Sequence, residues 1–137
     1  MFSYPVTLTP AGGIFLVTSP DFPDVTGAGA SREEALRSAE TSFSDAIARR
    51  IDRGLGLPVP SADGIRVWLP TQTALKALVY QAMRRENVSR LELARRLQWQ
   101  TSQVSSLLDL THASRIDEYD AAFHALGQRI SVATVSE

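Results

Sequence analysis

The sequence has no cysteine and no excess of either charge. Its 137 residues include 14 Lys and Arg against 15 Asp and Glu, which gives a formal net charge of −1. Without cysteine the chain cannot form disulfides, thiolate zinc sites or a cysteine nucleophile, and this composition suits the reducing cytoplasm. No run approaches the roughly 18 apolar residues of a membrane helix, and residues 1–10 lack the basic and apolar regions of a signal peptide. We therefore expect a soluble cytoplasmic protein with no membrane partner.

The first half of the chain has the pattern of a small sheet with one helix. Segments rich in β-branched and aromatic residues alternate with Gly and Pro turns, and one long stretch repeats apolar residues at helical spacing. The expected strands are residues 2–9, residues 14–18, a short segment near Val25 and residues 65–70, and the expected helix runs from a capping box at Ser31–Glu34 to Gly54. The order β-β-β-α-β predicts an α+β domain over residues 1–70.

The acidic residues of this half do not have the pattern of a catalytic or metal-binding cluster. Residues 1–70 contain eight Asp and Glu against six Arg, a local charge of −2. Glu33, Glu34, Glu40 and Asp45 lie on the predicted helix. Asp21 and Asp24 flank prolines in a turn, where aspartate is common. A metal-dependent nuclease needs several converging carboxylates, and His112 and His124 have no partners at ligand spacing. We therefore predict no catalytic residue, no metal and no cofactor, and an acidic face that suits a basic protein partner.

From residue 71 the pattern is helical, and residues 71–137 predict a second, all-helical domain. Two short helices, over residues 89–97 and 101–108, are joined by a tight turn. Such turns usually place glycine where this chain has Gln98, so a left-handed backbone there costs about 1 kcal/mol and is expected to reshape the turn slightly. The apolar residues expected to face inward are Leu91, Ala94 and Leu97 in the first of these helices, and Ile116, Tyr119, Phe123 and Leu126 in the last helix of the chain. Paired helices at this spacing are typical of proteins that enter the major groove of DNA.

The positive charge of the chain is concentrated around these two helices. Between Lys76 and Ser106 there are six basic residues and two acidic ones, a local charge of +4, and from Asp109 onwards the local charge is −3. Because DNA responds to the local field, a nearly neutral chain can still bind phosphates through one basic face. The basic residues of this cluster are Lys76, Arg84, Arg85, Arg90, Arg95 and Arg96.

Short polar side chains lie on the outward face of the second helix, opposite its apolar residues. The predicted DNA-binding residues are Arg95, Arg96, Gln100, Thr101, Ser102, Gln103 and Ser106. The two arginines are expected to attract phosphates regardless of sequence, the next two residues to bind a phosphate at the helix start, and the last three to contact base edges. Gln103 is the best candidate for a bidentate contact to adenine.

The C-terminal segment RISVATV has the alternation of a β-strand, carried by Ile130, Val132 and Thr134. A lone strand after a helical domain has unpaired edges, and the same strand of a second subunit is its expected mate. Such pairing predicts a homodimer through these three residues, with the two-fold symmetry that a palindromic operator requires.

Both halves resemble one protein family. The ordered motifs YPVTLTP, the Gly-Gly hairpin, SPDFPDV, S-x-E-EAL and LPVPS resemble the N-terminal domain of HicB-type antitoxins. L-A-R-R-L followed by T-S-Q-V-S-S-L-L, THASRIDEYDAAFHALG and RISVATV resembles the C-terminal domain of the DNA-binding branch of that family. The resemblance implies a partial ribonuclease-H-like domain without nuclease activity, which caps a small HicA-type toxin that cleaves mRNA. It also implies a helix-turn-helix domain that binds double-stranded operator DNA, in a homodimer or tetramer that represses its own operon.

Two other interpretations of the sequence remain open at this point. The main alternative is a stand-alone helix-turn-helix repressor whose N-terminal domain senses a small ligand. A ribonuclease-H-like nuclease is a remote third, because residues 1–70 show no carboxylate cluster.

Overall fold

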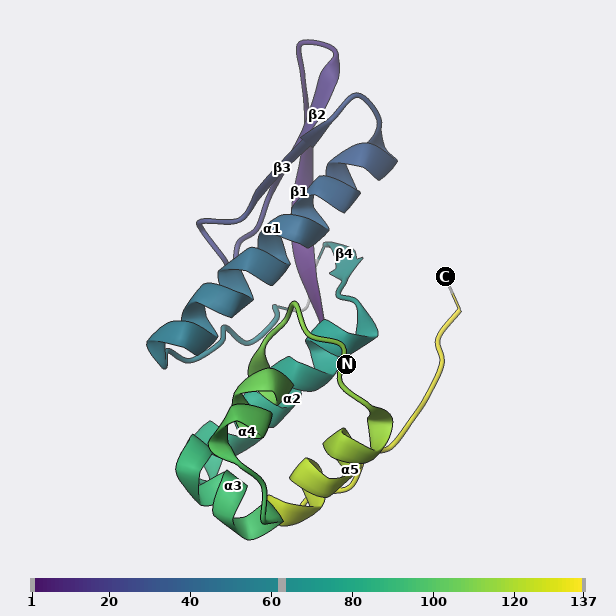
Figure 1. The fold of residues 1–137 in the computed structure, drawn as a ribbon. Helices are drawn as coiled ribbons and strands as arrows, with labels where there is room; N and C mark the ends of the chain where they lie inside the picture. The colour runs from purple at the N-terminus through teal and green to yellow at the C-terminus, as the bar shows by residue number, and fades with distance from the viewer. Residues whose placement is uncertain (1, 62–63, 137) are drawn as a thin grey trace. The chain divides into compact units, whose positions relative to one another are not determined.

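The computed structural model describes residues 2–61 and 64–136, and the chain folds into two compact units (Figure 1). The N-terminal unit extends to Ala74 and the C-terminal unit begins at Leu75, so that the boundary falls within a helix. The elements are β1 (Ser3–Ala11), β2 (Ile14–Thr18), β3 (Thr26–Gly29), α1 (Arg32–Arg53), β4 (Ile65–Trp68), α2 (Thr71–Arg85), α3 (Arg90–Leu97), α4 (Thr101–Leu108) and α5 (Ile116–Ala125). The predicted α+β class is confirmed. Among the described residues no helix is long and apolar enough to span a membrane.

The sheet of the N-terminal unit is antiparallel, with the strand order β3-β2-β1-β4. β1 and β2 form the expected hairpin around Gly12 and Gly13, whose φ angles of 58° and 85° favour glycine. The other end of β1 pairs with β4. The short third strand expected near Val25 begins at Thr26, and the Val25 side chain is buried in the core.

Helix α1 lies along one face of the sheet (Figure 1) and approaches β3 so closely that glycine is required there. A Cβ atom on Gly27 would lie 2.8 Å from two backbone atoms of α1. The backbone N–H groups of Thr26 and Ala28 donate to the hydroxyls of Ser42 and Ser38, at 3.2 and 3.3 Å. The helix therefore satisfies the outer donors of β3 and protects this edge from pairing with another strand.

The ends of α1 follow the sequence prediction with one difference. The hydroxyl of Ser31 accepts the N–H of Glu34 at 3.2 Å, as an N-cap does. The Glu34 carboxylate reaches back to the N–H of Ala30, at 3.0 Å, instead of the Ser31 amide that the capping box predicts. Gly54 ends the helix with φ 68°, as expected.

Aromatic side chains fill the core between the sheet and α1. Tyr4 packs edge-on against Phe22, with ring centroids 4.9 Å apart, and stacks on Phe43 at 5.3 Å. The phenol of Tyr4 donates to the carbonyl of Pro58 at 2.8 Å, and burial raises the pKa of this tyrosine. The core thus holds the chain that follows α1 against the start of β1.

The C-terminal unit is helical, as predicted, but two apolar residues face the other way. Leu93 and Ala94 are the buried residues of α3, whereas Leu91 is 70% exposed. Ile116, expected in the inner stripe of α5, is 60% exposed. Each of these two residues is at the first turn of a short helix, where only part of the apolar stripe has a neighbour to pack against.

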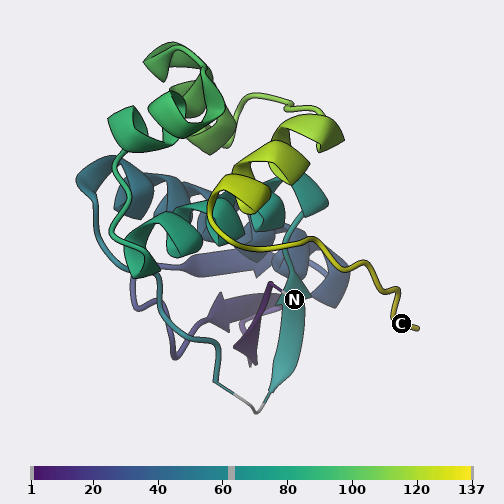
Figure 2. The same cartoon turned by 90° about the horizontal axis from the view of Figure 1, so that it is seen from below.

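Residues 128–136 leave the end of α5 as an extended segment in both views (Figure 1 and Figure 2). Within this single chain the segment has no strand pairing among the described residues. Val132 is 85% exposed. The predicted strand requires a second subunit, and dimerisation through Ile130, Val132 and Thr134 stays a prediction.

Candidate nucleic-acid interface

The turn between α3 and α4 is built without glycine. Gln98 ends α3 with φ 57° and ψ 37°, a left-handed conformation. The N–H groups of Gln98 and Trp99 donate to the Arg95 and Ala94 carbonyls, at 3.2 and 2.9 Å, and thereby satisfy the end of the helix. The expectation that glutamine would reshape the turn is wrong, because the turn keeps its left-handed residue at a cost of about 1 kcal/mol.

Helix α4 presents a polar face and a buried apolar face. Val104, Leu107 and Leu108 are buried, as predicted. The residues predicted to contact DNA from this helix and its start are Gln100, Thr101, Ser102 and Gln103, which are exposed, and Ser106, which is half-buried. The structure thus places all five on one continuous segment, next to the turn that follows α3.

One of these side chains already has a partner at the helix start. The Gln100 N–H donates to Gln103 Oε1 at 2.8 Å. This contact satisfies one of the unpaired N–H groups that every helix start leaves. Gln103 therefore caps α4 through its carbonyl oxygen and presents the rest of its amide to solvent.

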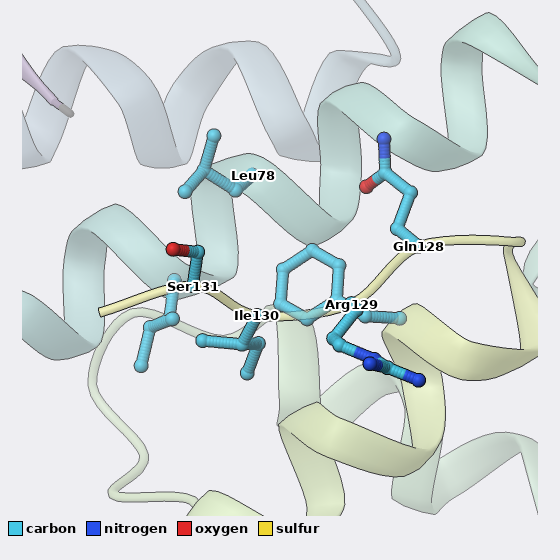
Figure 3. Close-up of a pocket in the computed structure, with 7 residues that line it drawn as sticks. Leu78, Gln128, Arg129, Ile130 and Ser131 are labelled. Atoms are coloured by element: carbon cyan, nitrogen blue, oxygen red, sulfur yellow. The ribbon is translucent and has the colours of Figure 1, made fainter.

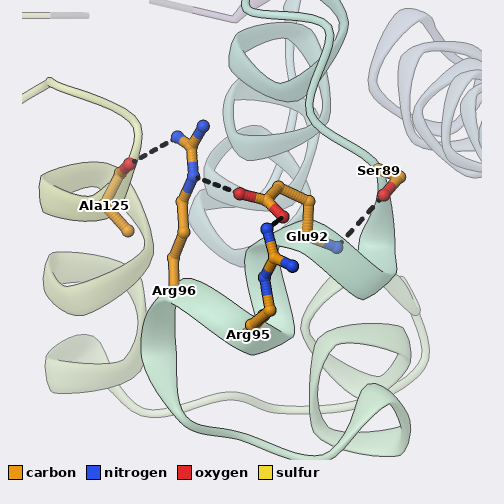
Figure 4. Close-up of polar contacts among 5 residues, drawn as sticks. All are labelled: Ser89, Glu92, Arg95, Arg96 and Ala125. Carbon is orange, nitrogen blue, oxygen red and sulfur yellow. Dashed lines mark hydrogen bonds and ion pairs between the residues drawn. The ribbon is translucent and has the colours of Figure 1, made fainter.

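The two predicted phosphate-binding arginines share one carboxylate (Figure 4). Glu92 contacts Arg95 Nη2 at 2.6 Å and Arg96 Nε at 3.2 Å. Arg96 also donates from Nη1 to the carbonyl of Ala125, at the end of α5, at 3.1 Å. Its side chain is 43% exposed, whereas that of Arg95 is 78% exposed. Arg95 therefore projects into solvent, and Arg96 links α3 to α5.

Lys76 is buried and is not part of the basic face that the sequence predicts. Its side chain is fully shielded from solvent, and its Nζ donates to the carbonyls of Ser106 and Leu107, at 3.1 and 3.0 Å. Nζ also donates to the Ser114 hydroxyl at 2.9 Å and lies 5.6 Å from the ring centroid of Tyr119. The ammonium thus caps the C-terminal end of α4, where carbonyls lack helical partners and the helix dipole favours a cation.

The surroundings of Lys76 shift its proton affinity in opposite directions. Burial lowers the pKa of the ammonium below the ordinary value, and the carboxylates of Asp109 and Glu118 partly counter this effect. The hydroxyl of Thr111 and its N–H donate to Asp109 at 2.7 and 2.9 Å, which lowers the pKa of that carboxyl. The end of α4 therefore carries the buried ammonium of Lys76 and the exposed carboxylate of Asp109.

The sequence contained a signal for this lysine that the charge count concealed. Lys76 lies three residues after Thr73 and four before Tyr80, and both of these are buried. A single lysine on the apolar stripe of a helix indicates a buried cation that needs carbonyl partners. Its charge therefore does not belong to the local +4 available to DNA.

The other basic residues of the cluster also have contacts in the folded unit. Arg90 donates to the Ser105 hydroxyl at 3.2 Å and joins the start of α3 to α4. The Arg84 guanidinium lies 5.9 Å from the centroid of the Tyr80 ring. Arg85 has a long contact of 3.8 Å with Glu86, and its side chain is 57% exposed.

The two turn aspartates of the N-terminal unit have structural partners. Asp21 accepts hydrogen bonds from the hydroxyl of Ser61, at 2.8 and 3.0 Å, and from its N–H at 3.1 Å. Asp24 pairs with Arg49 at 2.9 Å, and this hydrogen bond lowers the pKa of the aspartate. Over residues 2–61 and 64–136 there is no group of three or more His, Cys, Asp or Glu arranged to hold a metal. These acids anchor the turn to α1 and to the segment before β4.

A groove of about 360 Å³ lies at the root of the C-terminal segment (Figure 3). Leu75, Leu78 and Phe123 form its apolar wall, and the segment itself closes it at Ile130. The expected dimerisation residue Ile130 is therefore half-buried in its own subunit, whereas Val132 lies beyond the groove.

Comparison with known proteins identifies the family. Residues 3–78 match the model of a family described as HicB_like antitoxin of bacterial toxin-antitoxin system. The chain belongs to the HicB-like antitoxin family. Antitoxin HicB of Escherichia coli (strain K12) is 31% identical over 136 residues, which cover 96% of this chain and 99% of that protein. Antitoxin HicB 1 of Photorhabdus laumondii is 32% identical over 132 residues, with 94% and 84% covered, and Antitoxin HicB of Pseudomonas fluorescens (strain Pf0-1) is 32% identical over 135 residues, with 95% and 92% covered.

Proposed function

We propose that the protein is an antitoxin with two activities, one for each unit. The N-terminal unit binds and neutralises a small, mRNA-cleaving HicA-type toxin, and the C-terminal unit represses the operon by binding operator DNA. The observation that carries this proposal is similarity along nearly the whole chain to relatives named Antitoxin HicB. Both units are therefore covered by the comparison, not only the segment that the family model matches.

Neutralisation requires a surface that covers the toxin, not a catalytic group. One face of the sheet is packed against α1, and the other face has no helix of the N-terminal unit upon it. The register puts Leu16 and Ala28 on this open face, together with Thr7, Thr9 and Thr18. It carries no charged residue on β1, β2 or β3, and Ile14 and Leu16 are 42% and 39% exposed. On β4 the same face carries Arg66, whose guanidinium donates to the carbonyl and hydroxyl of Ser3. The half-apolar part over β1, β2 and β3 can be covered by a partner at little desolvation cost.

Operator binding is supported by the α3–turn–α4 segment as a helix-turn-helix motif with α4 in the major groove. Ser102, Gln103 and Ser106 then face the bases, while Gln100 and Thr101 meet the phosphate backbone. Arg95 and Arg96 stand at the end of α3 and add attraction that does not depend on sequence.

A dimer completes this proposal. Strand pairing between the C-terminal segments of two subunits, through Ile130, Val132 and Thr134, satisfies the backbone of a segment that has no pairing in one chain. The same pairing brings together two copies of α4, as a palindromic operator requires.

Co-expression tests the two activities separately. The full chain is produced with the short open reading frame that neighbours its gene, and growth, co-purification and binding to the DNA upstream of the operon are measured. We expect rescue of growth, a bound small basic protein and retention of the upstream DNA. A chain that binds DNA but purifies with a small metabolite and no protein is instead a ligand-sensing repressor.

A further inference from the structure

The geometry points to Gln103 as a contact that presents its NH2 group, a hydrogen-bond donor, to DNA and therefore selects guanine rather than adenine. This inference rests on the proposed operator binding through α4. It concerns which base the protein requires, a property that the residue type alone leaves open, because a glutamine side chain both donates and accepts.

The first step is the orientation of the amide. The partner of the Gln103 side chain is the backbone N–H of Gln100, at 2.8 Å. A backbone N–H can only donate, so the atom that faces it must be the carbonyl oxygen Oε1. The NH2 group then points away from the helix start into solvent, and Gln103 is exposed. No hydrogen bond of this NH2 group occurs among the described residues.

The second step is that folding favours this orientation in the bound state as well. The N–H of Gln100 is at the start of α4, and its partner is the side chain of Gln103. Turning the amide of Gln103 towards a base with its oxygen forward would leave that N–H without its acceptor. A contact that keeps Oε1 on the backbone avoids this loss.

The third step is the match to base edges. A bidentate contact to adenine uses the glutamine oxygen to accept from N6 and the NH2 group to donate to N7. Oε1 keeps a second lone pair, but it is turned towards the Gln100 N–H, so that the NH2 group is what a base edge meets. Against the N6 amino group of adenine this NH2 group stands as donor against donor. Guanine presents two neighbouring acceptors, N7 and O6, that both amide hydrogens can satisfy. Gln103 in this orientation therefore favours guanine.

The experiment selects duplexes from a random pool with the full chain and with two variants. Gln103→Glu keeps an oxygen acceptor for the Gln100 N–H and suits a helix start, but it has no hydrogen to donate. Ser102→Ala changes a neighbour on the same exposed face and is the matched control. We expect the wild type and Ser102→Ala to require guanine at one position of each half-site. Gln103→Glu should lose that requirement at an unchanged melting temperature.

Base analogues at the selected position identify the contact. Replacing the guanine with 7-deazaguanine, which lacks N7, or with adenine should weaken wild-type binding about 5- to 150-fold. Inosine keeps N7 and O6 and should bind as well as guanine. Gln103→Glu should not distinguish guanine from 7-deazaguanine.

The outcomes separate this inference from the proposed function. Selection of a defined sequence with adenine at the position controlled by Gln103 would overturn the inference and leave operator binding intact. The same holds if a defined sequence is selected and Gln103→Glu requires the same bases as the wild type. If the wild type enriches no sequence and does not bind the DNA upstream of its operon, the proposed function fails and the inference fails with it.

Discussion

Replacing Lys76 with methionine tests whether this buried lysine holds the C-terminal unit together. Lys76→Met keeps an unbranched apolar side chain in place but removes all three N–H donors. The carbonyl of Leu107 loses its Nζ donor, whereas the carbonyl of Ser106 keeps the N–H of Asp109 at 3.2 Å. The hydroxyl of Ser114 keeps its side-chain hydrogen bond with Tyr119. The substitution therefore leaves the Leu107 carbonyl without its Nζ donor. It also removes one hydrogen bond each from the Ser106 carbonyl and the Ser114 hydroxyl, which keep another partner.

The magnitude follows from these losses. A buried acceptor without a donor costs about 1–3 kcal/mol of stability. Each lost hydrogen bond from a charged donor costs about 1.5–3 kcal/mol. Removal of the buried ammonium returns part of this, because its desolvation penalty disappears. We expect Lys76→Met to lower the free energy of unfolding of the C-terminal unit by about 2–4 kcal/mol, out of the roughly 5–15 kcal/mol that is usual for a domain.

Urea unfolding can follow this unit alone, because the two tryptophans of the sequence lie in different units. Trp68 belongs to β4 and Trp99 to the turn before α4. In a Trp68→Phe background the fluorescence of Trp99 reports the C-terminal unit. Arg84→Met is the matched control, since it removes the same charge from the same helix at an exposed position, where the guanidinium lies over the Tyr80 ring. Equal stability of Lys76→Met and Arg84→Met would refute the role assigned to Lys76.

The pH dependence gives an independent check on the same residue. Burial lowers the pKa of Lys76 in the folded state, while the unfolded chain has the ordinary value of about 10.4. The unfolded chain thus binds the proton more tightly, and the contribution of Lys76 to stability rises as pH increases through the folded pKa towards that value. The stability difference between wild type and Lys76→Met should therefore widen between neutral pH and about pH 10. A difference that shrinks over this range would contradict the burial of the ammonium.

Three further changes test other parts of the structure. Gly27→Ala should lower the stability of the N-terminal unit by about 1–3 kcal/mol in urea unfolding, because a Cβ atom would meet the backbone of α1 at 2.8 Å. Arg95→Ala and Arg96→Ala should each weaken binding to operator and scrambled DNA alike. Each should also reduce the slope of the logarithm of the binding constant against the logarithm of salt concentration by about one. Only Arg96→Ala should also destabilise the C-terminal unit, by about 1 kcal/mol, because it loses the Ala125 carbonyl. Deletion of residues 129–137 should convert a dimer to a monomer in light scattering and abolish tight operator binding, and retention of either would contradict strand pairing.

The strands and helices of the N-terminal unit were predictable wherever the pattern of the sequence is local. Alternating apolar residues indicate β1 and β2, and Ser31 and Gly54 indicate the ends of α1. The segment TGAG of β3 has one residue that favours a strand, Thr26, followed by Gly, Ala and Gly, which do not. It is a strand because glycine allows α1 to approach and because Ser38 and Ser42 accept its N–H groups. The sequence indicated a short strand near Val25, but this packing depends on distant residues and was not predictable from the local pattern.

In the C-terminal unit the sequence predicted the elements better than the side-chain contacts. Residue types indicated a polar face on α4, which the structure confirms, but not that Gln103 would cap its own helix. Helical spacing favoured Leu91 as an inward residue, whereas Leu93 is buried. A helix of two turns offers several apolar faces of similar quality. The choice between them depends on which neighbouring helix is present.

The charge available to DNA follows from these contacts rather than from the count of basic residues. Lys76 is buried, and the carboxylate of Glu92 lies against both Arg95 and Arg96. A DNA phosphate that approaches either arginine must compete with this carboxylate. A contact between the arginine and DNA therefore replaces the Glu92 carboxylate with a phosphate. Such an exchange adds less affinity than the neutralisation of a free cation, and it makes binding depend more strongly on correctly placed contacts from α4. In the operator binding that we propose, a partly neutralised basic face on a nearly neutral chain favours one operator over the coating of DNA.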